Sequence, residues 1–408
     1  MSKRAIKKLQ RLFFLSLLLS LLLSACRPKP PHFSPILPEY SKDATSVTDA
    51  DKTRLALHHA TPMPQPTQTP WPVSTSTPVS TPTTPMLSDV NPLTGLKVSN
   101  PSLLHQRPLL VKIGNWPESL RPADGLNKAD MVFEYYNDDF TNQILALYYG
   151  DDHPHVGPLV EGRVIDARIT EHQQGILVLA GGDDIFRDVL KNYLQDRYLM
   201  RGSVPCPGIC TDTVAQGGLT YVDTNALRDR VASQSSSDFI PSLFGLTFSE
   251  APPVSKDAAT RFSYIYADFS VTDWRYIPEE QHYELWQDKS LSANNYTLSK
   301  SYDRGTGEAI TFENILFLYT KYSSYRQKFY DINFDDGNTQ QPGILIRDGQ
   351  LYHIIWSVAN YDEPFLIYKL NGEPMPLKPG RTWITLATID STIEQVNETE
   401  WDMHFIIK

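Results

Sequence analysis

The segment from Thr61 to Pro85 most constrains what this chain can fold into, because it is built almost entirely from Pro, Thr, Ser and Gln. Such a composition offers little apolar surface to bury, and proline cannot donate a backbone hydrogen bond to a helix or an inner strand. We therefore expect residues 26–90 to form an extended tether. The folded part of the 408-residue chain is then expected in the residues that follow it.

The N-terminus predicts what the tether is attached to. Five basic residues precede an apolar run from Leu12 to Leu23 that is too short for a stable transmembrane helix, a pattern typical of a signal peptide over residues 1–25. The run ends in the lipobox Leu23-Ser24-Ala25-Cys26, whose cysteine would receive a diacylglyceryl group before cleavage in front of it. We expect a mature chain anchored to the cell membrane through lipidated Cys26, on the extracytoplasmic face. The alternative is an uncleaved N-terminal membrane helix with an incidental cysteine.

The net charge limits the classes of partner. It is -10 for the whole chain, and loss of a signal peptide with five basic and no acidic residues would lower it to about -15. Nucleic-acid binding needs a basic face, so we exclude it. An acidic surface also does not adhere to anionic lipid, which leaves the acyl chains as the expected membrane contact.

Residues 91–235 alternate between apolar strands and amphipathic helices. The expected strands cover residues 109–113, 131–136, 143–149 and 176–180. Helices are expected over 164–173 and directly after Gly181-Gly182, where Asp183 or Asp184 would be the N-cap. A shorter helix is expected to begin at Asn127, with Asp130 completing a capping box. Strands that alternate with helices predict an α/β domain.

Residues 236–408 have a different pattern, rich in Tyr and Trp and alternating between apolar and polar positions. Asp348-Gly349 and Asn371-Gly372 fall between expected strands, and both are typical two-residue hairpin turns. We therefore predict a mainly antiparallel β domain after the α/β domain, an α+β protein overall. The expected strands are 262–267, 283–286, 315–319, 344–347, 352–356, 365–370 and 382–386.

Two of the three cysteines form Cys206-Pro207-Gly208-Ile209-Cys210. Thiols oxidise outside the cytoplasm and a Pro-Gly turn brings the two side chains together, so we predict a disulfide between Cys206 and Cys210. The alternatives are a zinc site, for which no second cysteine pair or paired histidine lies nearby, and a redox pair, for which the spacing is one residue too long.

The candidate functional cluster consists of Glu134, Arg163, Asp166 and Arg168. Glu134 is an acid within an apolar strand, and the other three lie at a junction between a loop and a helix, where sites of α/β proteins usually occur. Two carboxylates there could perform general acid and base chemistry on a glycan bond. The alternative is a structural salt-bridge network in which Arg163 or Arg168 pairs with Glu134.

Two further runs offer metal ligands, but we expect no metal and no cofactor. Asp151-Asp152-His153-Pro154-His155 is typical of a solvated turn. The run Asp331 to Gly337 resembles a calcium loop, yet its glycine is one place late and Pro342 stands where the bidentate Glu belongs, so a hairpin turn is the expectation. Gly181-Gly182 is only faintly similar to a dinucleotide turn, and the two aspartates after it would repel phosphate.

Over about residues 91 to 400 the chain resembles the YerB-like lipoproteins, a bacterial envelope family whose domains carry a domain-of-unknown-function label. The residues that carry the resemblance are Asn91-Pro92-Leu93-Thr94-Gly95-Leu96, Arg107-Pro108, Arg121-Pro122, Gly125-Leu126, Lys128-Ala129-Asp130, Val132-Phe133-Glu134, Leu145-Ala146-Leu147, Gly157-Pro158 and Pro379-Gly380-Arg381-Thr382-Trp383-Ile384.

The resemblance implies an extracytoplasmic lipoprotein of two domains, with no known reaction. The chain departs from the pattern at Asn142 and Val160, where the family usually has arginines, while Arg163 remains. If the family binds an anion with that arginine cluster, this member is expected to bind it weakly or not at all.

Two functional hypotheses follow. The first is a non-catalytic lipoprotein that holds an envelope protein or glycan, favoured by the aromatic β region and by the absence of an established nucleophile, zinc or phosphate-loop motif. The second is a cell-wall glycan hydrolase that uses Glu134 and Asp166, which would require a cleft with the two carboxylates about 5 to 9.5 Å apart.

Overall fold

The structure is a computed structural model that describes residues 89–213, 218–234, 239–334, 340–358 and 364–408. The predicted signal peptide, Cys26 and nearly all of the expected tether lie outside the described residues, as do residues 335–337 of the calcium-like run. The start of that run, expected as a hairpin turn, is instead strand, because Asp331 to Asn333 belong to β15 (Phe329–Asn333). The described residues belong to one compact unit. None of their helices has the length and apolar character required to span a bilayer.

A central sheet contains strands from both halves of the sequence. Within the described residues its twelve strands are β1 (Leu109–Ile113), β2 (Met131–Tyr136), β3 (Asn142–Tyr148), β4 (Ile176–Leu179), β5 (Tyr198–Met200), β8 (Asp257–Ala258), β14 (Asn314–Arg326), β15 (Phe329–Asn333), β16 (Gln341–Arg347), β17 (Gln350–Ser357), β18 (Leu366–Lys369) and β19 (Thr382–Thr388). The main order is β18-β17-β16-β14-β19-β2-β3-β1-β4-β5.

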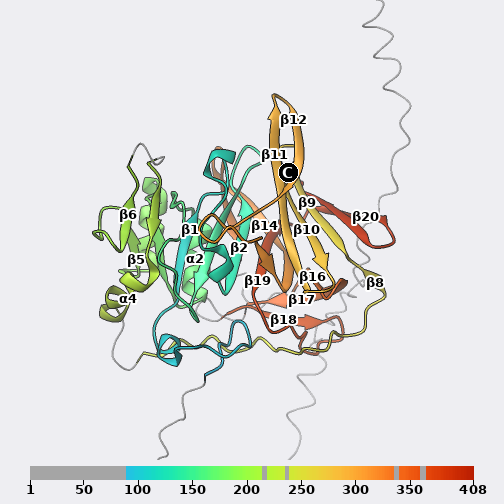
Figure 1. The fold of residues 1–408 in the computed structure, drawn as a ribbon, viewed down its shortest axis with the longest axis horizontal. Helices are drawn as coiled ribbons and strands as arrows, with labels where there is room; N and C mark the ends of the chain where they lie inside the picture. The colour runs from blue at the N-terminus through green and yellow to red at the C-terminus, as the bar shows by residue number, and fades with distance from the viewer. Residues whose placement is uncertain (1–88, 214–217, 235–238, 335–339, 359–363) are drawn as a thin grey trace, which may run out of the picture. The chain divides into compact units, whose positions relative to one another are not determined.

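The two halves meet where β2 runs parallel to β19, with Phe133 opposite Ile384. Figure 1 shows β1 and β2 of the first half beside β14 and β19 of the second. Strands from both sides of the boundary predicted near residue 235 therefore share one hydrogen-bonded sheet. This pairing brings the motif around Glu134 next to the motif around Trp383.

A second sheet lies against one face of the first. Within the described residues it has seven strands, β9 (Arg261–Ala267), β10 (Ser270–Ile277), β11 (His282–Ser292), β12 (Asn295–Lys300), β13 (Thr311–Phe312), β20 (Thr392–Asn397) and β21 (Glu400–His404). All its pairings are antiparallel except that of β21 with β9. A separate ribbon pairs β6 (Ile209–Thr211) with β7 (Thr220–Val222). The mixed α/β region followed by a mostly β region confirms the predicted fold class.

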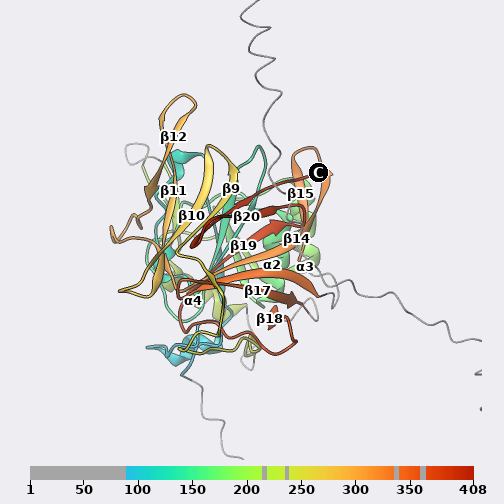
Figure 2. The ribbon, with the colours of Figure 1, turned by 90° about the vertical axis from the view of Figure 1, so that its right-hand side faces the viewer.

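Helices cover the opposite face of the central sheet. They are α2 (Val164–His172) and α3 (Asp184–Tyr193), while α4 (Thr224–Ser233) packs near β4 and β5. In Figure 2, α2 and α3 lie on one side of β14 and β19, and β9, β10 and β11 lie on the other. The predicted cap of α3 is confirmed, because the Asp183 carboxylate accepts the Phe186 N–H at 2.8 Å.

Side-chain alternation along β2 divides the interior into two apolar cores. Phe133 and Tyr135 pack on the helix side, together with Ile165 of α2. Val132 and Tyr136 point to the other side, where the core includes Trp274 of β10. Glu134 lies between Val132 and Tyr136 in this alternation, so its side chain enters the core between the two sheets.

In the described part of the first half lie three short 3-10 helices, η2 (Pro101–His105), η3 (Glu118–Leu120) and η4 (Leu126–Lys128). The expectation that Asn127 is an N-cap is wrong. Asn127 lies inside η4, which follows Gly125, a residue with φ of 85°. A Cβ atom on Gly125 would meet His153 at 2.9 Å, so both the backbone angle and the close approach of the histidine favour glycine.

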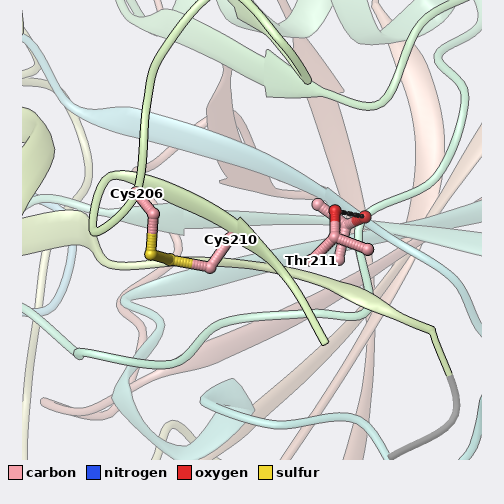
Figure 3. Close-up of a disulfide and its surroundings, with 4 residues drawn as sticks. Cys206, Cys210 and Thr211 are labelled. Carbon is pink, nitrogen blue, oxygen red and sulfur yellow. Dashed lines mark hydrogen bonds between the residues drawn. A yellow bond between two sulfur atoms is a disulfide. The ribbon is translucent and has the colours of Figure 1, made fainter. Parts of the chain in front are cut away.

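Cys206 and Cys210 are joined by a disulfide just before and within β6 (Figure 3). Their Cα atoms are 4.9 Å apart. On the same ribbon, the hydroxyls of Thr211 and Thr220 form a 2.9 Å hydrogen bond. The disulfide therefore lies on the ribbon of β6 and β7, outside the two larger sheets.

Candidate functional site

Glu134 is fully buried between the two sheets. Its carboxylate accepts hydrogen bonds from Thr272 Oγ1 at 2.6 Å, Trp383 Nε1 at 2.8 Å, Thr385 Oγ1 at 3.1 Å, and the amide of Asn142. Burial raises the pKa of Glu134, and these four donors oppose that shift by favouring the carboxylate. A buried acid with four donors is a cross-link between β2, β3, β10 and β19.

The interpretation of Glu134 as the partner of Arg163 or Arg168 is wrong. All four partners of the Glu134 carboxylate are uncharged. One of them, Asn142, stands where the family resemblance implies an arginine, and it donates to Glu134 as a neutral amide.

Asp166 lies on the other face of the sheet, at the start of α2, and is also fully buried. Its carboxylate accepts the Tyr135 O–H at 2.6 Å and the Arg163 backbone N–H at 2.7 Å. The Lys112 ammonium, itself fully buried, is 3.6 Å from Asp166 and donates to the Tyr135 hydroxyl. Burial lowers the pKa of Lys112 to about 7, although the Asp166 carboxylate opposes this shift.

The two arginines of the predicted cluster do not complete a site around these carboxylates. Arg168 forms two hydrogen bonds to Asp331 of β15, at 3.1 and 2.8 Å. The Arg163 guanidinium bonds the Gly162 carbonyl and lies over the Phe329 ring, 5.1 Å from its centroid. The structure thus brings Arg163 and Asp166 together through a backbone contact, and leaves Arg168 in a separate ion pair.

The geometry removes the basis for paired catalytic carboxylates. Glu134 and Tyr135 are consecutive residues of β2 and point to opposite faces of the sheet, and Asp166 bonds the Tyr135 hydroxyl. The sheet separates the carboxylates of Glu134 and Asp166, and neither side chain reaches solvent. A glycan bond therefore cannot lie between them.

A pocket of about 420 Å³ lies where three separate parts of the sequence meet. We call it the acidic pocket. It is lined by Asn127, Lys128, His153, Glu280, His282, Glu284, Asp303, Thr306, Glu308, Ala309, Thr311 and Arg381. Four carboxylates and two histidines face only two fixed cations, so the lining is acidic above neutral pH.

Asn127 and Arg381 fix the inner wall of the acidic pocket. The Asn127 amide donates to the Ala309 carbonyl at 2.9 Å, and its side-chain carbonyl accepts from Arg381 at 3.3 Å. Arg381 also donates to Thr311 Oγ1 at 2.9 Å and lies over the Phe312 ring. Burial lowers the pKa of Arg381, against the opposing effect of Glu313. These contacts tie η4 to the segment that precedes β19.

A buried carboxylate, that of Asp124, orients His153, one of the two histidines of the acidic pocket. Asp124 is within 3.3 Å of His153 Nε2 and 2.6 Å of His155 Nδ1, and the His155 ring stacks on Tyr221. Burial alone would raise the pKa of Asp124, but the hydrogen bonds from the two histidines lower it. The predicted turn from Asp151 to His155 therefore has structural partners, and only its His153 lines the acidic pocket.

Two family models match the chain. The N-terminal domain of "Protein of unknown function (DUF3048)" covers residues 93–204, and the C-terminal domain of the same family covers 262–384. Together they span more than half of the 408 residues. The chain belongs to the DUF3048 family. Every residue that lines the acidic pocket falls within one of the two matched segments.

A curated relative and a solved structure agree with this assignment. This DUF3048 protein is 23% identical over 302 residues to the "Putative lipoprotein YerB" of Bacillus subtilis (strain 168). The matched region covers 72% of this chain and 85% of the relative. The crystal structure of YerB protein from Bacillus subtilis matches with a TM-score of 0.60 and 21% identity, over 73% of this chain and 96% of the other. This likeness shows a shared fold.

Sequence reasoning missed most of the acidic pocket in this DUF3048 protein. Glu280 and His282 belong to the polar run Glu279 to His282, and Glu308 follows a Gly-rich segment, both typical of turns. No local spacing connects these residues to His153. A signal did exist at Lys128 and Arg381, since both stand in the motifs that carry the family resemblance. Their meeting at one pocket required the parallel pairing of β2 with β19.

Proposed function

We propose that this protein is a lipid-anchored binding protein on the extracytoplasmic face of the cell membrane, whose acidic pocket holds a polar, amine-bearing group of the cell envelope. The observation that carries the proposal is the excess of carboxylates over fixed cations in that pocket. The name of the Bacillus subtilis relative and the lipobox at Cys26 support the location.

The charges of the acidic pocket differ in how far they are neutralised. Glu284 pairs with Lys300 at 2.7 Å, and Lys128 pairs with Asp151 at 3.0 Å. Glu308 is exposed, and no cation of the described residues lies within ion-pair distance of its carboxylate. Glu308 is therefore the group best placed to pair with an ammonium of a ligand.

The hydrogen bonds of the two threonine hydroxyls in the acidic pocket favour binding without catalysis. Thr306 Oγ1 accepts the Glu308 backbone N–H at 3.2 Å, and Thr311 Oγ1 accepts from Arg381. Nucleophilic catalysis by a hydroxyl needs a base that takes its proton. No histidine of the described residues accepts a hydrogen bond from either threonine.

The test of binding is cosedimentation of the chain from residue 27 onward with purified peptidoglycan. We expect binding that falls when the free amines of the peptidoglycan are acetylated. It should also fall for Glu308→Gln but not for the control Glu398→Gln, because Glu398 is an exposed acid in the turn between β20 and β21. Equal cosedimentation with acetylated and unmodified peptidoglycan would contradict an amine-binding pocket. Release of soluble glycan fragments by the wild type would instead favour a hydrolase.

The test of the anchor is metabolic labelling with a fatty-acid probe. We expect label in the wild type and none in Cys26→Ala, because the thioether would form at that thiol. A Cys26→Ala variant that still carries label would contradict the lipobox assignment.

A further inference from the structure

A second pocket, of about 360 Å³, lies between the segment Asn115–Leu126 and the hairpin of β11 and β12. It is distinct from the acidic pocket, because successive residues of β11 line the two: Glu284 lines the acidic pocket and Leu285 the second one. The same alternation holds for Ala309 and Ile310. We call it the amphipathic pocket, because its lining combines aliphatic and polar side chains.

The floor of the amphipathic pocket is aliphatic. Ala123, Leu126, Ile144, Leu285 and Ile310 line it, and each is at most 4% exposed. Several buried aliphatic side chains at the base of a concave site are typical of a pocket that takes the apolar part of a small molecule. Removing a short hydrocarbon chain from water there is favourable by about 25 cal/mol per Å².

One wall of the amphipathic pocket carries amides held in fixed orientations. Gln287 donates to Asn115 at 3.0 Å and accepts from Ser301 at the same distance. Asn115 in turn donates to Asn142 at 2.6 Å, the residue whose amide reaches Glu134. Asn115 and Gln287 are 5% and 6% exposed. Each amide nitrogen has a second hydrogen that these bonds do not use, so the wall presents ordered donors.

The charged groups that line the amphipathic pocket are three cations, Arg121, Lys289 and Lys300, and two acids, Glu118 and Asp288. The side chain of Arg121 is 10% exposed; it pairs with Asp288 at 2.7 Å, and its buried Nε–H has no hydrogen-bond partner among the residues that the structure describes. Lys289 is exposed, and its ammonium has no ion-pair partner among the described residues. One oxygen of the Glu118 carboxylate accepts the Ser290 N–H at 3.0 Å. The Arg121 Nε–H and the Lys289 ammonium are therefore cationic donors that a ligand carboxylate could use.

We propose that the amphipathic pocket binds a small organic carboxylate with a short apolar chain. The chain would lie on the floor formed by Leu126, Leu285 and Ile310, and the carboxylate would face Lys289 and the amide wall. A buried unpaired donor such as Arg121 Nε costs free energy unless a ligand or water supplies an acceptor. This site is independent of the acidic pocket, whose charge has the opposite sign.

The experiment uses three probes of equal chain length, hexanoate, hexanol and hexylammonium, titrated into the chain from residue 27 onward with labelled Ile and Leu methyl groups. We expect hexanoate to shift the methyl resonances of Leu126, Leu285 and Ile310 with a dissociation constant of about 1 mM, the range for such a small ligand. Hexanol should bind about threefold more weakly and hexylammonium more weakly still. Methyls of Ile185, which is exposed on α3, should not shift.

Two variants make the result decisive. Lys289→Gln should weaken hexanoate about threefold and leave hexanol unchanged, while Lys321→Gln, an exposed lysine on β14, should change neither. Ala123→Leu should block both probes by filling the floor, with a thermal melt to show that the variant is folded. The proposal is overturned if hexanol binds as tightly as hexanoate, if Lys289→Gln has no effect, or if none of the floor methyls shifts.

Discussion

The polar residues inside the central sheet contrast with those that line the two pockets. Glu134 is fully buried and accepts four hydrogen bonds from three other strands of the two sheets. Glu308 and Lys289 are exposed, and neither has an ion-pair partner among the described residues. The first kind of residue stabilises the fold because its bonding capacity is used, whereas the second kind can still bind a ligand.

This contrast gives a structural reason for an acid in an apolar strand. Desolvation of a carboxylate is costly, so a buried acid must be surrounded by donors. At Glu134 these donors come from the protein itself, which leaves no lone pair for a substrate. The groups that our proposals assign to ligands include Glu308, before β13, and Lys289, on β11; both are exposed, so water can satisfy them in the absence of a ligand.

The largest expected effect is that of Glu134→Gln on stability. The new amide can keep its carbonyl toward Trp383, but its NH2 then faces Asn142, whose own carbonyl already accepts from Asn115. Two donors would meet in a buried place, so we expect the free energy of unfolding to fall by about 3 kcal/mol. Urea denaturation measures it. The matched change Glu308→Gln should cost nothing, and equal losses for the two variants would break the comparison.

The next effect is the pH dependence caused by Lys112. Its pKa in the folded chain is lowered to about 7 by burial, whereas an unfolded lysine titrates near 10.4. Between these values the unfolded chain binds a proton that the folded chain does not, so the free energy of unfolding rises with pH. Charged groups close to Lys112 are Asp166, which raises its pKa, and Arg163, which lowers it.

We expect a rise on the order of 2 kcal/mol between pH 7 and 9 in the wild type, and a flat curve over that range in Lys112→Met. Urea denaturation at several pH values compares the two proteins. In Lys112→Met, Asp166 keeps the Tyr135 and Arg163 donors, so the variant should fold. A slope that persists in the variant would show that another group causes it.

The strands of the first half could be predicted because they are continuous apolar runs. Strands such as β1 and β4 are buried on both faces, and this burial requires apolar residues at every position except Lys112. The strands β12, β20 and β21 were missed because their exposed faces carry polar and charged residues, which leaves a weak alternation. Asp348-Gly349 was correctly predicted as the turn between β16 and β17.

The pairing of strands far apart in sequence could not be predicted. Phe133 lies opposite Ile384, and nothing in either segment specifies the other. Both pockets depend on this pairing, because each is lined by residues from both matched domains. The same limit applies to Arg168, whose partner Asp331 belonged to a run that was interpreted as a turn.

A smaller effect is expected for the ion pair between Arg168 and Asp331. It joins α2 to β15 with two hydrogen bonds, but its side chains are 17% and 33% exposed, so solvent screens it. A double-mutant cycle with Arg168→Met and Asp331→Asn should give a coupling energy of about 1 kcal/mol by urea denaturation. A coupling energy near 3 kcal/mol would show that this partly exposed pair stabilises the fold as much as a buried group such as Glu134. The distinction between buried stabilising residues and exposed residues would then need revision.

The smallest expected effect on stability is that of Glu308→Gln, and it sharpens the comparison most. Glu308 is exposed and has no cation partner among the described residues, so removal of its charge should change the free energy of unfolding by less than about 0.5 kcal/mol. The same change should weaken binding of an amine-bearing ligand severalfold, because the ligand would lose its ion pair in a pocket where Glu284 is already neutralised by Lys300. Denaturation and peptidoglycan cosedimentation on one preparation measure both quantities. A loss of stability without a loss of binding would make Glu308 a structural residue, and the acidic pocket would then no longer be the ligand site.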